Sequence, residues 1–141
     1  MTLMIDASSL SQLQYHRIYS DARAKWGWYG ESHFDLVKIE QSLVNAAPPS
    51  PPLYMSGEEP ASKYVFCSFE PGWIGDWHPA PARQFMVLLS GTGEVETSDG
   101  NVERFKPGDI LLLEDTWGKG HRLRNTGEEY LHFFVVQLPI V

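Results

Sequence analysis

The sequence predicts an all-β fold, a sandwich or barrel of short antiparallel strands. Three observations predict it. Beyond residue 55, short apolar or alternating segments recur between turns rich in glycine and proline. The pair Asp99-Gly100 joins two of these segments, and Asp-Gly supplies the positive φ that tight hairpin turns require. No helical period of apolar residues is present beyond residue 55.

The expected strands can be placed in chain order by their composition. Residues 63–70 (KYVFCSFE) and 83–91 (RQFMVLLSG) are rich in residues that favour strands, and a Pro-Gly turn lies between them. The clearest pair, 94–97 (EVET) and 102–105 (VERF), flanks the Asp-Gly turn and should form a hairpin. Three further strands are expected within residues 106–114, 121–125 and 129–139.

The part of the chain before these strands has a different character. We expect an N-terminal arm and proline-rich connector over residues 1–53, followed by a barrel domain over residues 54–141. Four prolines between Asn45 and Leu53 cannot continue a helix or a central strand, so we expect an extended connector there. Within the arm, residues 8–26 are expected to hold a short helix and residues 32–43 a strand.

Composition and charge limit the classes of function. The chain has 141 residues, of which 43% are hydrophobic, so one compact domain is expected. The net charge of −7, with no basic stripe, argues against nucleic-acid binding. No run approaches the roughly 20 apolar residues that cross a bilayer, and the first residues lack the pattern of a signal peptide, so we expect a cytoplasmic protein without a membrane partner. The single cysteine, Cys67, is expected to pack as a small hydrophobe.

Two motifs frame the candidate site, and the first surrounds a histidine. It runs from Gly72 through His78, Ala80 and Gln84 to Gly91, with five, one, three and six residues between successive members. Positions 78, 80 and 84 are separated by even numbers, so in an extended segment they point to one side.

The second motif contains His121. It runs from Gly108 to Gly118, His121 and Asn125, with two residues between Gly118 and His121 and three before Asn125. In this spacing the two motifs resemble those of the cupins, small jelly-roll barrels of the double-stranded β-helix type. The resemblance covers about residues 60–139 and implies that both motifs face the barrel interior. Two extra residues after Gly108, and Thr116 in the place of a proline, depart from the family pattern.

The resemblance implies a metal site that is incomplete in this chain. Cupins that bind metal generally use three histidines and a glutamate as ligands. Here Ala80 and Gln84 stand in the places of the second histidine and the glutamate, which removes a donor and a negative charge. His78, Gln84 and His121 are left to hold a divalent ion such as Mn, Fe, Ni or Zn. Candidates for a further ligand are His33, His132, Glu114 and Asp115.

A barrel without metal offers a different site. His78 and His121 are then expected to act as an acid/base pair, because a neutral imidazole takes or gives a proton near pH 7. Asp115 is a candidate for orienting one of them. Gln84 and Met86 are expected to line the substrate pocket from the inward side of their strand. Further substrate contacts are expected from tryptophans near the turns, namely Trp73, Trp77 and Trp117.

Three functions remain open at this point. The first is a single-domain cupin that binds a small organic molecule in its barrel, with His-based chemistry of the dehydratase, cyclase, isomerase or decarboxylase type. The second is a metal-dependent cupin enzyme with a His/Gln/His site, and the third is a non-catalytic ligand sensor. The resemblance also implies a homodimer, in which the arm covers a neighbouring subunit, unless the arm closes its own barrel as a lid. Arg83, adjacent to the inward Gln84, is expected to face outward.

Overall fold

The computed structural model describes residues 13–21 and 30–140, and in these ranges it contains strands and no helix. No helix that could cross a bilayer occurs in this part of the chain. The strands are β1 (Gln14–Ser20), β2 (Ser32–Lys38), β3 (Ser42–Val44), β4 (Leu53–Met55), β5 (Lys63–Phe69), β6 (Gln84–Ser90), β7 (Gly93–Thr97), β8 (Val102–Phe105), β9 (Ile110–Leu113), β10 (His121–Asn125) and β11 (Leu131–Gln137).

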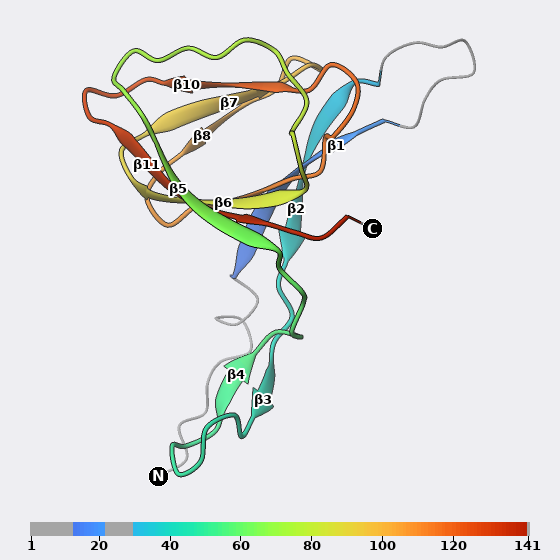
Figure 1. Cartoon of the computed structure of the whole chain (residues 1–141), viewed down its shortest axis with the longest axis vertical. Coiled ribbons are helices and arrows are strands. Elements are labelled where there is room, and N and C mark those ends of the chain that lie inside the picture. The colour runs from blue at the N-terminus through green and yellow to red at the C-terminus, as the bar shows by residue number, and fades with distance from the viewer. Residues whose placement is uncertain (1–12, 22–29, 141) are drawn as a thin grey trace.

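Two facing sheets form the jelly roll. The larger sheet has the strand order β2-β1-β9-β6-β11-β5, and the smaller has the order β10-β7-β8. Figure 1 shows β10, β7 and β8 across from β11, β5 and β6. The two sheets remain separate, so the described strands form an open barrel. The all-β jelly-roll prediction is therefore confirmed.

The predicted hairpin is also confirmed. β7 pairs antiparallel with β8, and Gly100 in their turn has a φ of +94°. An L-residue with a side chain rarely adopts that φ, which is why the Asp-Gly signal is informative.

The expected helix in the arm is wrong where the structure can test it. Residues 14–20 form β1, which pairs antiparallel with β2 and parallel with β9. Ile18 of β1 is fully buried in the core, so packing against β9 outweighs a weak local preference for helix. β1 and β2 thus extend the larger sheet of the barrel itself. The rest of the expected helix lies outside the described residues.

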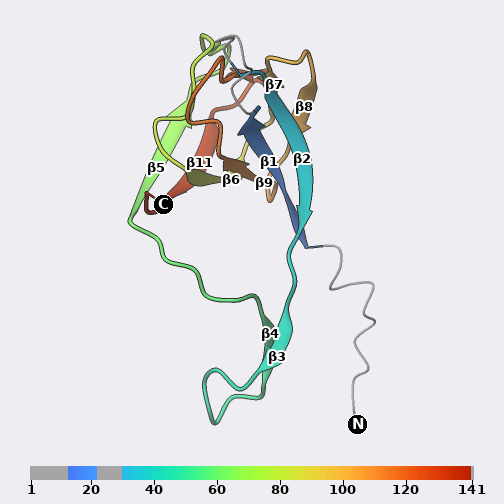
Figure 2. The ribbon, with the colours of Figure 1, turned by 90° about the vertical axis from the view of Figure 1, so that its right-hand side faces the viewer.

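The proline-rich connector is a second correction. Instead of an extended linker, it forms the turn of a hairpin in which β3 pairs antiparallel with β4. Figures 1 and 2 both show this hairpin projecting away from the two facing sheets. Prolines are compatible with the turn because no ladder hydrogen bond is required of them there.

The core lies between the two facing sheets and is apolar over most of its length. Side chains alternate along each strand, so Met86 and Leu88 of β6 point inward while Leu89 is exposed. Val95 of β7 and Leu123 of β10 meet them from the smaller sheet. Several buried side chains are polar, and they provide the chemistry described next: Ser32, Gln84, Thr97, Asp115, His121 and Asn125.

Candidate functional site

The two motif histidines meet at one end of the barrel. His78 and His121 form an isolated antiparallel bridge, with the His78 amide donating to the His121 carbonyl at 3.1 Å and the reverse bond at 3.0 Å. Their ring centroids are 4.9 Å apart. His121 is 5% exposed, whereas His78 is exposed to solvent. The site therefore combines a buried imidazole, that of His121, with a solvent-accessible one, that of His78.

Asp115 orients the buried imidazole. The Nδ1 atom of His121 lies 2.6 Å from Oδ2 of Asp115, whose side chain is fully buried. Because a carboxylate accepts, Nδ1 donates, and Nε2 of the neutral ring keeps its lone pair. His78 has the same arrangement, since its Nδ1 lies 2.8 Å from the carbonyl oxygen of Asp76. Both rings are thus held through Nδ1, with Nε2 left for a substrate proton or a ligand.

One buried polar atom at this end is not satisfied by the described residues. Oδ1 of Asp115 is buried without a hydrogen-bond partner in these ranges. Gln84 as a whole residue is 9% exposed, and its carboxamide makes no hydrogen bond to a described residue. Gln84 begins β6 opposite Leu113, two residues before Asp115, so it lies at the histidine end of the barrel. Unsatisfied buried polar groups are costly, and a bound polar molecule would offset that cost.

The other two inward motif positions have structural roles. Ala80 is buried in the apolar core, and its amide donates to the carbonyl of Asp115. Asn125 lies at the opposite end of β10 from His121. Its Nδ2 donates to three backbone carbonyls, of Phe69, Glu70 and Glu129, and its Oδ1 accepts from the amide of Gly127. Asn125 therefore fastens loops at the end of the barrel remote from the histidines.

The predicted aromatic and apolar contacts are dispersed. Trp73 packs edge-on against Phe69 at 4.6 Å and adjoins the core. Trp77 is exposed and lies beneath the guanidinium of Arg122, on the outward side of β10. Met86 belongs to the apolar core.

The ring of Trp117 lies beside Gly30. A Cβ at Gly30 would be 2.6 Å from its ring, so the tryptophan occupies the space beside that glycine. Trp117 also accepts a hydrogen bond at its carbonyl from the Ser20 hydroxyl, at 2.7 Å. The arm and the loop before β10 are thus fastened together close to His121.

The donor set fits a divalent metal poorly. Within residues 13–21 and 30–140, no three His, Cys, Asp or Glu side chains are grouped to hold an ion. Of the four candidate extra ligands, only Asp115 is at the site, and its Oδ2 is engaged by His121. His33 is paired with Asp21 and Asp99, His132 with Ser68, and Glu114 with Arg17 and Arg83. Two imidazoles and an amide oxygen remain as donors, so the set lacks the third histidine or the carboxylate of the usual sites.

Sequence reasoning missed one residue on which the site depends. Gly120 has a φ of +75°, and a Cβ there would lie 2.0 Å from the carbonyl oxygen of His78. Only glycine allows the two histidine-bearing segments to approach this closely. The glycines beside Lys119, immediately before His121, are the signal that could have identified it.

Comparison with known proteins identifies one family model and several similar structures. The family model described as Cupin domain matches residues 65–137. A Cupin 2 conserved barrel domain protein from Salinispora arenicola is 17% identical, with a TM-score of 0.46 and coverage of 72% of this chain and 76% of that one. A conserved protein with a double-stranded beta-helix domain from Klebsiella pneumoniae is 27% identical, with a TM-score of 0.48 and coverage of 68% and 83%.

One relative carries the name of an enzyme. The (R)-mandelonitrile lyase of Granulicella tundricola is 30% identical over 60 residues, which are 43% of this chain and 46% of that protein. The chain thus matches about half the length of that relative. Because the Cupin domain match spans more than half of its length, the chain belongs to the cupin family.

Proposed function

We propose that the chain binds a small organic molecule at the histidine end of its barrel and removes a proton from it with His121. The observation that carries this proposal is the hydrogen bond of 2.6 Å between a fully buried Asp115 and a nearly buried His121. A buried carboxylate on Nδ1 fixes the ring orientation and stabilises the imidazolium that forms when Nε2 takes a proton. Asp115 is thus a positioning residue, and His121 is the general base.

Proton transfer would run between the two rings through the substrate. Nε2 of His121 takes a proton from a hydroxyl or an activated C–H of the substrate, and the released electron pair expels a leaving group. His78 enters the step protonated and gives its proton to that group, so that one proton leaves the substrate and one joins the product. The exposed ring of His78 then recovers a proton from water, and His121 returns one.

A lyase reaction fits this scheme best. The named relative supports it, because mandelonitrile carries a hydroxyl and a leaving group on the same carbon. The carboxamide of Gln84, which makes no hydrogen bond to a described residue, would hydrogen-bond a polar substituent of the substrate. The proposed substrate class is therefore a small α-hydroxy compound with a leaving group on the carbon that bears the hydroxyl.

The first test uses mandelonitrile as the probe. Benzaldehyde release is measured by liquid chromatography above the rate in buffer alone, for the wild type and for His121→Ala, Asp115→Asn and His132→Ala. Loss of the general base should lower kcat/KM by about 10²–10⁴-fold. Asp115→Asn should lower kcat and change the pH profile while leaving KM nearly unaltered. His132 is exposed and bonded to Ser68, so its replacement should have no effect.

The outcomes separate the three readings of the site. Wild-type turnover that survives His121→Ala would refute the proposed base. Binding of benzaldehyde without turnover of mandelonitrile would favour a ligand sensor. Elemental analysis of the same protein tests the metal alternative: one equivalent of Mn, Fe, Ni or Zn that is lost in His121→Ala would favour a His78/Gln84/His121 metal site.

We also propose that the chain is a homodimer held by the β3–β4 hairpin. An isolated two-stranded hairpin is marginally stable in water, and this one carries exposed apolar side chains, including Leu43 at 60% exposure and Leu53. Burial of these apolar side chains against a second copy of the chain would stabilise the hairpins of both copies. Light scattering of Leu43→Lys should report a monomer, whereas the matched change Leu89→Lys on β6 should leave the dimer intact. A wild-type monomer at micromolar concentration would refute this proposal.

A further inference from the structure

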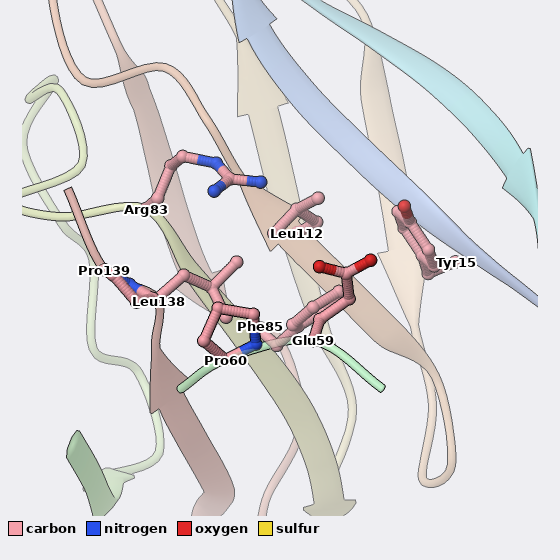
Figure 3. A pocket seen from close by; sticks show the side chains of 8 residues that line it. All are labelled: Tyr15, Glu59, Pro60, Arg83, Phe85, Leu112, Leu138 and Pro139. Atoms are coloured by element: carbon pink, nitrogen blue, oxygen red, sulfur yellow. The ribbon is translucent and has the colours of Figure 1, made fainter. Parts of the chain in front are cut away.

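A pocket lies on the outer face of the larger sheet, and neither His78 nor His121 lines it. Its volume is about 410 Å³, which is within the range of small-molecule sites. Figure 3 shows its lining: Tyr15, Glu59, Pro60, Arg83, Phe85, Leu112, Leu138 and Pro139. These residues come from β1, β6 and β9, the segment after β11 and the segments immediately before β5 and β6.

The floor of this outer pocket is apolar and preformed. Phe85 and Leu112 are register partners across β6 and β9 and point away from the core, which contains their neighbours Met86, Leu111 and Leu113. Leu112 lines the pocket and is only 3% exposed. The ring of Tyr15 packs edge-on against Phe85 at 5.2 Å. An apolar side chain of a ligand would find a ready contact surface here.

Arg83 supplies a fixed positive charge at one side. Its Nε donates to Oε2 of Glu114 at 2.7 Å, and the other oxygen of Glu114 accepts from Nε of Arg17 at 2.7 Å. This pairing holds the guanidinium by one edge. Apart from Glu114, no residue in the described part of the chain pairs with this guanidinium or its two Nη nitrogens. They form the fork that binds a carboxylate with two parallel hydrogen bonds.

Glu59 supplies the opposite charge. Figure 3 shows its carboxylate and the Arg83 guanidinium both directed toward the space above Leu112. The two groups form no ion pair, so every nitrogen of Arg83 is more than 4.0 Å from the Glu59 oxygens. The Tyr15 hydroxyl lies at the same side of the pocket. Burial, with Glu114 nearby, raises the pKa of Tyr15, so this hydroxyl stays neutral and can donate a hydrogen bond.

We propose that the outer pocket binds a small zwitterion, an amino acid with an apolar side chain, whose carboxylate lies on Arg83 and whose ammonium group lies on Glu59. The separated charges are complementary to that ligand and to neither a simple anion nor a simple cation. The apolar floor takes the side chain. This site does not depend on the histidines, so it stands or falls separately from the proposed lyase activity.

The test is a titration with L-phenylalanine, followed by ¹H–¹⁵N NMR. The ligand is small, so we expect a dissociation constant on the order of 1 mM, with the largest shifts at the amides of the outer pocket. Arg83→Gln should weaken binding about 10- to 100-fold, the effect of losing hydrogen bonds to a charged group. Glu59→Gln, at an exposed position, should weaken it about 2- to 5-fold. Phenethylamine lacks the carboxylate and should bind about as poorly as L-phenylalanine binds to Arg83→Gln.

Arg122→Gln is the matched control. Arg122 also pairs with a glutamate, Glu96, and its guanidinium lies over the ring of Trp77. It belongs to the smaller sheet and not to the outer pocket, so its replacement should not alter binding. Glu59→Gln removes no ion pair, so it remains informative if Arg83→Gln lowers stability. The proposal is overturned if L-phenylalanine shifts no amide of the outer pocket at about 10 mM. It is equally overturned if phenethylamine binds as well as L-phenylalanine, or if Arg122→Gln weakens binding as much as Arg83→Gln.

Discussion

Replacement of His33 should make the stability of the fold less dependent on pH. Its Nε2 lies 2.7 Å from Asp21 and its Nδ1 lies 2.9 Å from Asp99, so one ring joins the end of β1 to the β7–β8 turn. Both nitrogens donate only when the ring is protonated. The hydrogen bond to Asp21, partly opposed by burial and reinforced by Asp99, raises the pKa of His33 above its usual value of 6.5.

The sign and size of the effect follow from this arrangement. A histidine whose pKa is raised on folding contributes stability that is complete below pH 6.5 and is lost as the pH rises through the folded pKa. Asp21 is 47% exposed, so each ion pair contributes only about 0.2–1 kcal/mol, or about 1 kcal/mol together. For a domain of this size that corresponds to a change in Tm of about 3–4 °C.

Two neighbouring carboxylates, those of Asp99 and Glu31, do not titrate in the same window. Burial acts to raise the pKa of Asp99, but hydrogen bonds from Thr97, Asn101 and His33 outweigh it, and the pKa is lowered. The pKa of Glu31 is also lowered, first by Lys119 and then by Ser98. Their contributions are lost only in acid, well below the range in which His33 titrates.

The assay compares thermal unfolding of the wild type and His33→Gln from about pH 5.5 to pH 9. The wild type should have the higher Tm by about 3–4 °C at the acid end, and the difference should shrink as the pH rises. His132→Gln is the control, because that histidine makes a hydrogen bond to Ser68 and no ion pair. A wild-type advantage that stays constant with pH, or grows toward pH 9, would refute the reasoning.

Three further predictions concern the core and the site. Gly120→Ala should destabilise the fold by more than the about 1–2 kcal/mol that a left-handed backbone costs a residue with a side chain, because the new Cβ meets the carbonyl of His78. Gly100→Ala is the control: its φ is +94° and nothing lies within 4 Å of the new Cβ, so it should cost only the backbone strain. Equal losses of unfolding free energy in urea denaturation would contradict the geometry. Leu131→Ala, at a fully buried position, should cost about 2–5 kcal/mol by the same measurement, and a loss below about 1 kcal/mol would contradict its place in the core. Burial raises the pKa of the Cys67 thiol, so alkylation by iodoacetamide should be slower than for a free thiol at about pH 8 and increase as the pH rises; the rate of a free thiol would argue against this.

The fold could be predicted where the signals are local. The turn that contains Gly100 needs a positive φ, and the alternation of β6 follows from its own residues. The strand β1 could not be recognised in the same way, because it is stabilised by β9, which lies far along the chain. The prolines of residues 45–53 correctly excluded helix, but local sequence does not distinguish a linker from a hairpin turn.

The positions of the candidate site residues could be predicted in part, whereas their roles remain predictions. The spacing of the motifs brought His78 and His121 to one end of the barrel, and Asp115 proved to lie on the second of them. The tryptophans could not be placed in advance, because a ring beside a turn is free to pack inward, as Trp73 does, or outward, as Trp77 does. Such choices depend on contacts between distant segments, which residue type and spacing do not encode.

The position of β1 beside β9 has a consequence for biosynthesis. During translation the first strand of the larger sheet leaves the ribosome long before its partner, which spans Ile110–Leu113, has been made. Until then the apolar side of β1 and β2 has no sheet to pack against. Protection of these two strands from aggregation depends on chaperones or on the solubility of the emerging chain. Assembly of the larger sheet must therefore wait until β9 has been made, and chains arrested before residue 110 should be readily degraded by protease.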